Sequence, residues 1–125
     1  MAVELKAAIR GLALENDDFR REVMTGPHSH VVLMSVAPGS EIGDEVHPDV
    51  DQVRVFVDGA GEAVLDGETS GVKPGDLVFV PAGTRHNFVN RGDTALKLYT
   101  VYSPPEHEAG TVHHTKEEAD AAEHH

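Results

Sequence analysis

The stretch "GDLVFVPAGTRHNFVN", residues 75–90, decides the fold class. Its valine-rich first half ends at Pro81, which cannot donate to a sheet ladder, and Gly83 supplies a backbone that can reverse direction. His86 then opens a second apolar segment. A strand, a tight reversal and another strand are typical of an antiparallel sheet, and here the second strand begins with a histidine.

The same pattern extends over residues 21–103. Short segments rich in β-branched and aromatic residues alternate with Gly, Pro, Asp and Asn, and Asp66-Gly67 has the sequence of a type I′ hairpin turn. Many short strands without helices between them indicate an antiparallel sandwich or barrel. The predicted strands are 21–25, 29–36, 51–57, 62–67, 76–80, 85–90 and 96–102.

Helix is predicted only towards the two ends. Residues 4–15 can form a short helix with one apolar stripe. Residues 115–123 open with Thr115, three positions before Glu118, which is the spacing of a capping box. Because this second helix has almost no large apolar residue, we expect it to be solvated.

Length and composition exclude several classes of protein. A chain of 125 residues fits one domain, with a predicted core at about 21–103 and a C-terminal tail at 104–125. Without cysteine there is no disulfide, zinc–thiolate site or cysteine nucleophile. A net charge of −12 disfavours nucleic acid and anionic membranes, and no apolar run is long enough for a membrane span. We expect a soluble, cytoplasmic protein that binds a small molecule.

The spacing in residues 75–90 resembles the second motif of the cupins, which are small jelly-roll barrels that carry a metal in the barrel mouth. The matching residues are Gly75, Pro81, Gly83, His86 and Asn90. This resemblance implies an all-β fold, namely a cupin jelly-roll β-barrel with short terminal helices.

A first cupin motif is expected upstream, with the usual order Gly, His, His, Glu and Gly. Residues 39–59 keep the frame through Gly39 and Gly59 but place Glu45, His47 and Gln52 at the three ligand positions. Glu45 therefore stands where the first histidine is usual, and Gln52 stands where the glutamate is usual. The resemblance covers most of residues 30–103.

These positions imply one divalent metal ion held by Glu45, His47, Gln52 and His86. Glu45 and His47 are two residues apart, so on a strand they share a face and lie ~7 Å apart at Cα. Imidazole, carboxylate and amide donors suit zinc, iron, nickel or manganese, and they leave coordination positions open for a substrate.

Strand parity extends the predicted site. Counting in twos from Gln52 places Arg54 and Phe56 inside the barrel, where they can contact a substrate. For Arg54 the alternatives are a salt bridge to an interior carboxylate or a bulge that turns it outward. The opposite row is also apolar, and a second subunit is the usual cover for such a face, so we expect a homodimer. That row consists of Val53, Val55 and Val57.

The remaining histidines carry weaker signals. His28 and His30 have no carboxylate nearby in the sequence, and we expect both to be exposed strand residues. His107, His113 and His114 follow a Pro-rich exit from the last strand. Such a tail can fold over a barrel mouth, but a solvated tail is the expectation.

The runs "VPAGTRHN" and "LKLYTVYSPPEH" resemble small bacterial cupins labelled as similar to mannose-6-phosphate isomerase. Phosphomannose isomerases hold zinc with two His, one Glu and one Gln, the same residue types as here. The resemblance implies a metal-dependent isomerase or lyase acting on a small polar or anionic metabolite such as a sugar derivative, with Glu45 as catalytic base. An iron-dependent dioxygenase, a non-catalytic ligand-binding or sensory cupin, and a structural barrel with a vestigial site are the alternatives.

Overall fold

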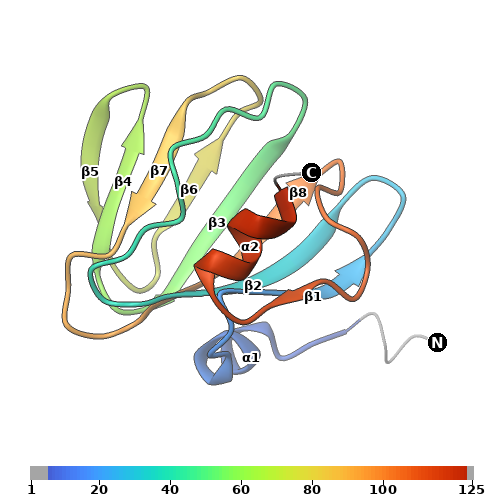
Figure 1. Cartoon of the computed structure of the whole chain (residues 1–125), viewed down its shortest axis with the longest axis horizontal. Coiled ribbons are helices and arrows are strands. Elements are labelled where there is room, and N and C mark those ends of the chain that lie inside the picture. Colours follow the sequence, from blue (N-terminus) through green and yellow to red (C-terminus); the bar gives the residue numbers. More distant parts are fainter. Residues whose placement is uncertain (1–5, 124–125) are drawn as a thin grey trace.

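The computed structural model describes residues 6–123, which form an all-β fold with one short helix towards each end (Figure 1). The helices are α1 (Ile9–Glu15) and α2 (Lys116–Glu123). The strands are β1 (Arg20–Thr25), β2 (His30–Val36), β3 (Asp51–Asp58), β4 (Gly61–Leu65), β5 (Glu68–Val72), β6 (Leu77–Val80), β7 (His86–Val89), β8 (Leu96–Ser103) and β9 (Val112–His113).

The strands form two antiparallel sheets. One has the order β6-β3-β8-β2-β1-β9, and the other has the order β5-β4-β7. Residues 37–50 connect the sheets, because this loop leaves β2 and forms isolated bridges to β7 at Glu41–Val89 and Glu45–His86. The described strands do not close into one continuous ring, so the jelly roll predicted from the sequence is an open barrel.

The main core lies between the two sheets and follows strand parity. Alternate residues of β2, β3 and β8 are buried together with Phe88 of β7 and Ala63 of β4. Burial of such apolar surface contributes about 25 cal/mol per Å² to stability. The inward residues of the larger sheet include Val32, Met34, Val36, Phe56, Leu96 and Leu98.

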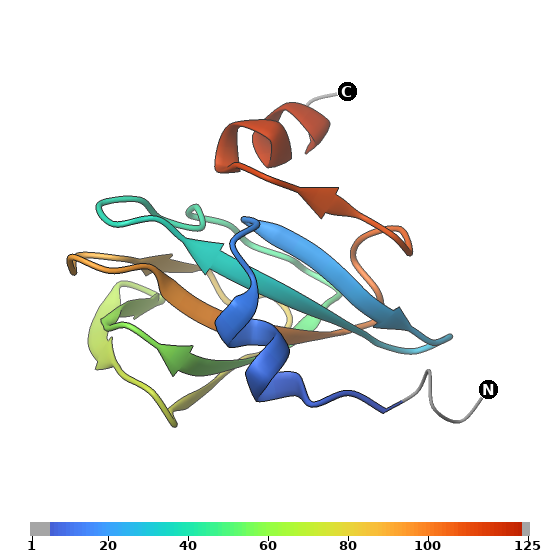
Figure 2. The ribbon, with the colours of Figure 1, turned by 90° about the horizontal axis from the view of Figure 1, so that it is seen from below.

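A second, smaller cluster lies on the outer face of the larger sheet. Ala13 of α1 packs there with Leu33 and Val57. Figure 2 shows α1 lying across the strands on this side. The outward-facing Val57 is therefore covered by the chain's own helix, whereas the apolar row of Val53, Val55 and Val57 predicted a second subunit as the cover.

Each of the predicted strands is present within one or two residues of its expected bounds. The hairpin turn is confirmed, because Asp66 and Gly67 have φ angles of 49° and 85°. Two strands, β5 and β9, were not predicted. α1 is shorter than the predicted helix, whose residues 4–5 lie outside the described part of the chain.

The C-terminal segment packs against the barrel, contrary to the expectation of a solvated tail. The predicted capping box is present, since the backbone N–H of Glu118 donates to Thr115 Oγ1 at 3.1 Å and the N–H of Thr115 donates to Glu118 Oε2 at 3.3 Å. Ala119 of α2 is buried in the main core, and β9 pairs with β1. The small Ala side chain supplies the apolar contact for which the sequence offers no large residue.

No helix within residues 6–123 has the length and apolar character needed to cross a membrane.

Candidate metal centre

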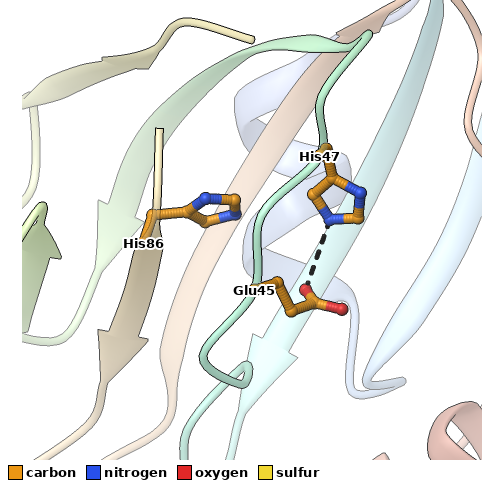
Figure 3. Close-up of side chains that lie close together, drawn as sticks. All are labelled: Glu45, His47 and His86. Carbon is orange, nitrogen blue, oxygen red and sulfur yellow. Dashed lines mark ion pairs between the residues drawn. The ribbon is translucent and has the colours of Figure 1, made fainter. Parts of the chain in front are cut away.

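Glu45, His47 and His86 converge at one end of the barrel (Figure 3). One ligand atom from each lies within 4.8 Å of the others. Backbone hydrogen bonds hold the loop to β7: Glu45 and His86 exchange N–H···O bonds of 2.9 Å in both directions, and the N–H of Gly83 donates to the His47 carbonyl at 2.9 Å. Three of the four predicted ligands are thus brought together by the backbone.

His86 presents one nitrogen to the cluster. Its Nδ1 lies 2.9 Å from the Thr84 carbonyl oxygen, an acceptor, so Nδ1 carries the proton and Nε2 keeps a lone pair. Burial, and to a smaller degree the positive charge of Arg54, lowers the pKa of His86 below its usual value. The imidazole is therefore neutral near pH 7, the form that ligates a metal.

His47 lies between two carboxylates. Its Nδ1 is 3.1 Å from Glu106 Oε1, and its Nε2 is 3.5 Å from Glu45 Oε1. Hydrogen bonding to Glu106, then to Glu45, raises the pKa of His47 to about 9 against the opposing effect of burial. Burial opposes ionisation of both carboxyls, but His47, with smaller contributions from other positive side chains such as Arg20, outweighs it, and the pKa of each carboxyl lies below its usual range.

Gln52 is buried beside His86 but faces another partner as well. Its Nε2 lies 3.4 Å from His86 Nε2, while its Oε1 accepts hydrogen bonds from Arg54 Nε at 3.1 Å and Arg54 Nη2 at 2.5 Å. The oxygen expected to ligate a metal is thus engaged by the guanidinium. Ligation by Gln52 stays a prediction and requires this oxygen to be shared or released.

Arg54 and Phe56 point inward, as strand parity predicts. Arg54 is only 1% exposed and lies over the rings of Phe88 and Tyr102, with centroid distances of 4.9 and 5.8 Å. Its polar contacts are the Gln52 amide and Met34 Sδ, rather than the interior carboxylate considered from the sequence. Phe56 packs on Phe88 in the core. Substrate contact by either residue stays a prediction.

Glu106 contacts the cluster from outside, and sequence reasoning missed it. It lies in the segment between β8 and β9, and its backbone N–H donates to His30 Nε2 at 3.1 Å. This segment encloses a cavity of about 10 Å³, close to the space that one water molecule needs. The cavity is lined by Arg20, Glu45, His47, Tyr102, Glu106 and His107.

Two expectations about histidines were wrong. His30 is buried, with its ring 5.1 Å from that of Tyr102, because β2 lies in the interior of the sheet. His107 packs edge-on against Tyr102 at 5.4 Å, and burial lowers its pKa to about 3. His28 and His114 are exposed, as expected.

Comparison with known proteins agrees with this architecture. The family model described as "Cupin domain" matches residues 32–102. An uncharacterized protein of Bacillus subtilis, YrkC, is 44% identical over 115 residues, which make up 87% of this chain and 62% of YrkC. The chain therefore spans less than two thirds of that relative.

Solved structures give the same result. The crystal structure of BH2720 from Bacillus halodurans matches with a TM-score of 0.91 and 38% identity, covering 93% of this chain and 92% of that one. A protein described as a predicted oxalate decarboxylase from Thermotoga maritima matches with a TM-score of 0.59 and 26% identity, covering 62% and 68% of the two chains. With more than half of its length matched by the family model, this chain belongs to the cupin family.

Proposed function

We propose that this protein is a metal-dependent enzyme that acts on a small polar or anionic metabolite, with one divalent ion held by Glu45, His47 and His86. The observation that carries the proposal is the convergence of two imidazole nitrogens and one carboxylate oxygen within 4.8 Å. The similarity to a cupin described as a predicted oxalate decarboxylase supports a small anionic substrate.

The donor set fits a divalent metal in charge and in protonation. The Glu45 carboxyl has a lowered pKa and is ionised near neutral pH, and His86 Nε2 keeps its lone pair. His47 has a raised pKa, so the surroundings of its ring favour positive charge. A metal ion would replace the proton on His47 Nε2 as the carrier of that charge.

A bound divalent metal would supply Lewis-acid chemistry, polarising a carbonyl or hydroxyl oxygen of the substrate. Glu45 is the one of the three ligands that begins as an anion and becomes neutral when it accepts a proton, so we assign it the proton transfer between adjacent substrate atoms. The segment that carries Glu106 and His107 lines a small cavity beside Glu45 and His47. An isomerase or lyase uses these functions without an oxidant.

The two-histidine, one-carboxylate set also favours a second candidate, an iron-dependent dioxygenase, because non-haem iron oxygenases use such a facial triad. Oxygen consumption by the iron-loaded protein in the presence of a substrate distinguishes the dioxygenase from isomerase or lyase chemistry. A protein that binds metal and ligand without turnover in either assay is a binding or sensory cupin.

Metal uptake tests the proposal directly. Protein purified without a histidine tag is incubated with zinc, nickel, manganese or iron(II), and bound metal is measured by elemental analysis after gel filtration. We expect one ion per chain. A protein that retains none of the four ions contradicts the proposal.

Substitutions locate the ion. His86→Ala should weaken binding most, by about a hundredfold, because it removes a nitrogen donor already oriented by Thr84. Gln52→Ala should weaken it least, since its oxygen is engaged by Arg54. His28→Ala is the matched control, because His28 is exposed and outside the cluster. Equal affinity of His86→Ala and wild type would place the ion elsewhere.

A further inference from the structure

We propose that Glu106 is a positioning residue of the metal centre: its carboxylate holds Nδ1–H of His47, so that His47 Nε2 faces the ion. This inference rests on the proposed function. It assigns a role to a residue outside both cupin motifs, on the segment between β8 and β9.

The contacts of His47 separate its two nitrogens. Nε2 faces Glu45, a member of the three-residue cluster, at 3.5 Å, whereas Nδ1 faces Glu106 at 3.1 Å on the other side of the ring. Glu106 does not belong to the cluster whose ligand atoms lie within 4.8 Å of one another. Glu106 therefore lies on the side of the His47 ring that faces away from the cluster. A carboxylate at this position fixes the tautomer and the ring plane of a metal-bound histidine.

His86 has an equivalent partner. Its Nδ1 is held by the Thr84 carbonyl at 2.9 Å, which leaves Nε2 for the cluster. Each imidazole thus has its outer nitrogen fixed by an oxygen. The inner nitrogen of His47 faces Glu45, and that of His86 lies 3.4 Å from Gln52 Nε2. The two rings face one another at a centroid distance of 5.6 Å.

Glu106 is itself held in place by contacts on both sides. Its N–H donates to His30 Nε2 at 3.1 Å, and the neighbouring His107 packs on Tyr102 and on His30, with centroid distances of 5.4 and 5.7 Å. The buried rings of His30 and His107 thus support the segment that brings a carboxylate to His47.

The second oxygen of Glu106 independently indicates that this carboxylate lies next to a positive charge. Oε2 is buried and has no hydrogen-bond partner among residues 6–123. A buried carboxylate oxygen without a partner costs stability unless a nearby positive charge compensates it. The carboxylate contacts His47, which carries this charge when protonated. With a metal ion in place of the Nε2 proton, the charge of the ion would compensate the carboxylate through the same ring.

Cobalt(II) provides a probe with two readouts. Affinity is measured by competition with a chelator for wild type, Glu106→Ala, Glu106→Gln and the control Glu108→Ala, which removes an exposed carboxylate two residues away. Glu106→Ala should bind Co²⁺ 10–100-fold more weakly. Glu106→Gln keeps an oxygen acceptor and should lose less, while Glu108→Ala should match wild type. Circular dichroism establishes that each variant is folded.

The second readout is the proton NMR spectrum of the Co²⁺ protein in water. Wild type should show two shifted, exchangeable signals, one from Nδ1–H of His47 and one from Nδ1–H of His86. In Glu106→Ala the first should disappear through exchange with water, and the second, protected by Thr84, should remain.

The outcomes separate this inference from the proposed function. Wild type that binds no Co²⁺ overturns both. Wild type that binds Co²⁺ while folded Glu106→Ala binds it within twofold overturns only the role of Glu106. The role is also overturned if Glu106→Ala loses affinity but keeps both shifted signals, because the carboxylate then acts by charge alone.

Discussion

His47 and His86 meet in one cluster but differ in protonation. His47 is charged near pH 7, because two carboxylates raise its pKa to about 9. His86 is neutral, because burial lowers its pKa against the opposing effect of the Thr84 hydrogen bond, and its single ring proton lies on Nδ1, which donates to the Thr84 carbonyl. Metal binding therefore displaces a proton from His47 only, and affinity should rise with pH up to about 9.

The metal-free protein should lose stability as the pH rises from about 6.5 to about 9. A histidine whose pKa is raised on folding stabilises the folded state below its unfolded pKa, and this contribution is lost as pH passes the folded pKa. The groups facing His47 are Glu45, Glu106 and neutral His86, and the lowered pKa values of the carboxyls keep them ionised throughout. The expected loss is on the order of 1 to 3 kcal/mol.

Urea unfolding at pH 6.5, 7.5 and 9 in the presence of a chelator measures this loss. His47→Gln cannot be protonated and should give a flatter profile. If wild type and His47→Gln have parallel profiles, His47 does not carry the charge described here.

The sequence predicts Glu45, His47 and His86 because their spacing belongs to the strands and turns that bring them together. That Gln52 and Arg54 lie close together could also be predicted, since residues two apart share a strand face. Strand parity alone does not predict whether the two side chains bind each other or a ligand. Glu106 could not be predicted, because it follows the last long strand and its position depends on burial of His30 and His107.

At the scale of the elements, the turn from β3 to β4 leaves no room for a side chain at Gly59. Gly59 has φ of 81°, and a Cβ there would lie 2.5 Å from the Ala95 carbonyl oxygen. Gly39, the other glycine of the first motif, has a similar φ of 78° but nothing within 4 Å of its Cβ position. The pair thus separates backbone strain from steric clash.

Gly59→Ala should lower the free energy of unfolding by about 2 to 4 kcal/mol, through left-handed strain plus displacement of backbone. Gly39→Ala, which has the strain alone, should cost about 1 kcal/mol. Denaturant unfolding of both variants gives the comparison. Equal losses would mean that the backbone near Ala95 moves freely to accommodate a methyl group.

The strands that the sequence did not predict lack the apolar pattern on which prediction depends. In β5 only Val72 is buried, so buried and exposed residues do not alternate along it. The Asp66-Gly67 hairpin turn nevertheless predicts that a second strand follows. β9 is two residues long and is defined by its pairing with β1 rather than by composition. Both strands are therefore defined by their pairing with a neighbouring strand, which is a property of the tertiary structure and not of the local sequence.

At the scale of the whole molecule, one apolar strip lies on the outer face of the larger sheet. Leu77 and Phe79 of β6 are 59% and 50% exposed. They lie directly opposite Val55 and Val53 of β3, so all four side chains share a face. A hollow of about 320 Å³, lined in part by Val55 and Tyr99, adjoins the strip. The helix α1 covers Val57 but leaves Leu77 and Phe79 exposed.

We propose that a second copy of the chain covers this strip. Two chains of net charge −12 repel one another, so the contact depends on burial of the apolar side chains, and added salt should strengthen the dimer by screening the repulsion.

Light scattering at micromolar concentration should give twice the chain mass of 13.4 kDa. Phe79→Glu should give a monomer, because it would bury a charge in the contact. Thr69→Glu adds the same charge at an exposed position of β5, in the other sheet, and should stay dimeric. A wild-type mass of 13.4 kDa, or a Phe79→Glu protein that remains dimeric, would show that this strip is not the interface.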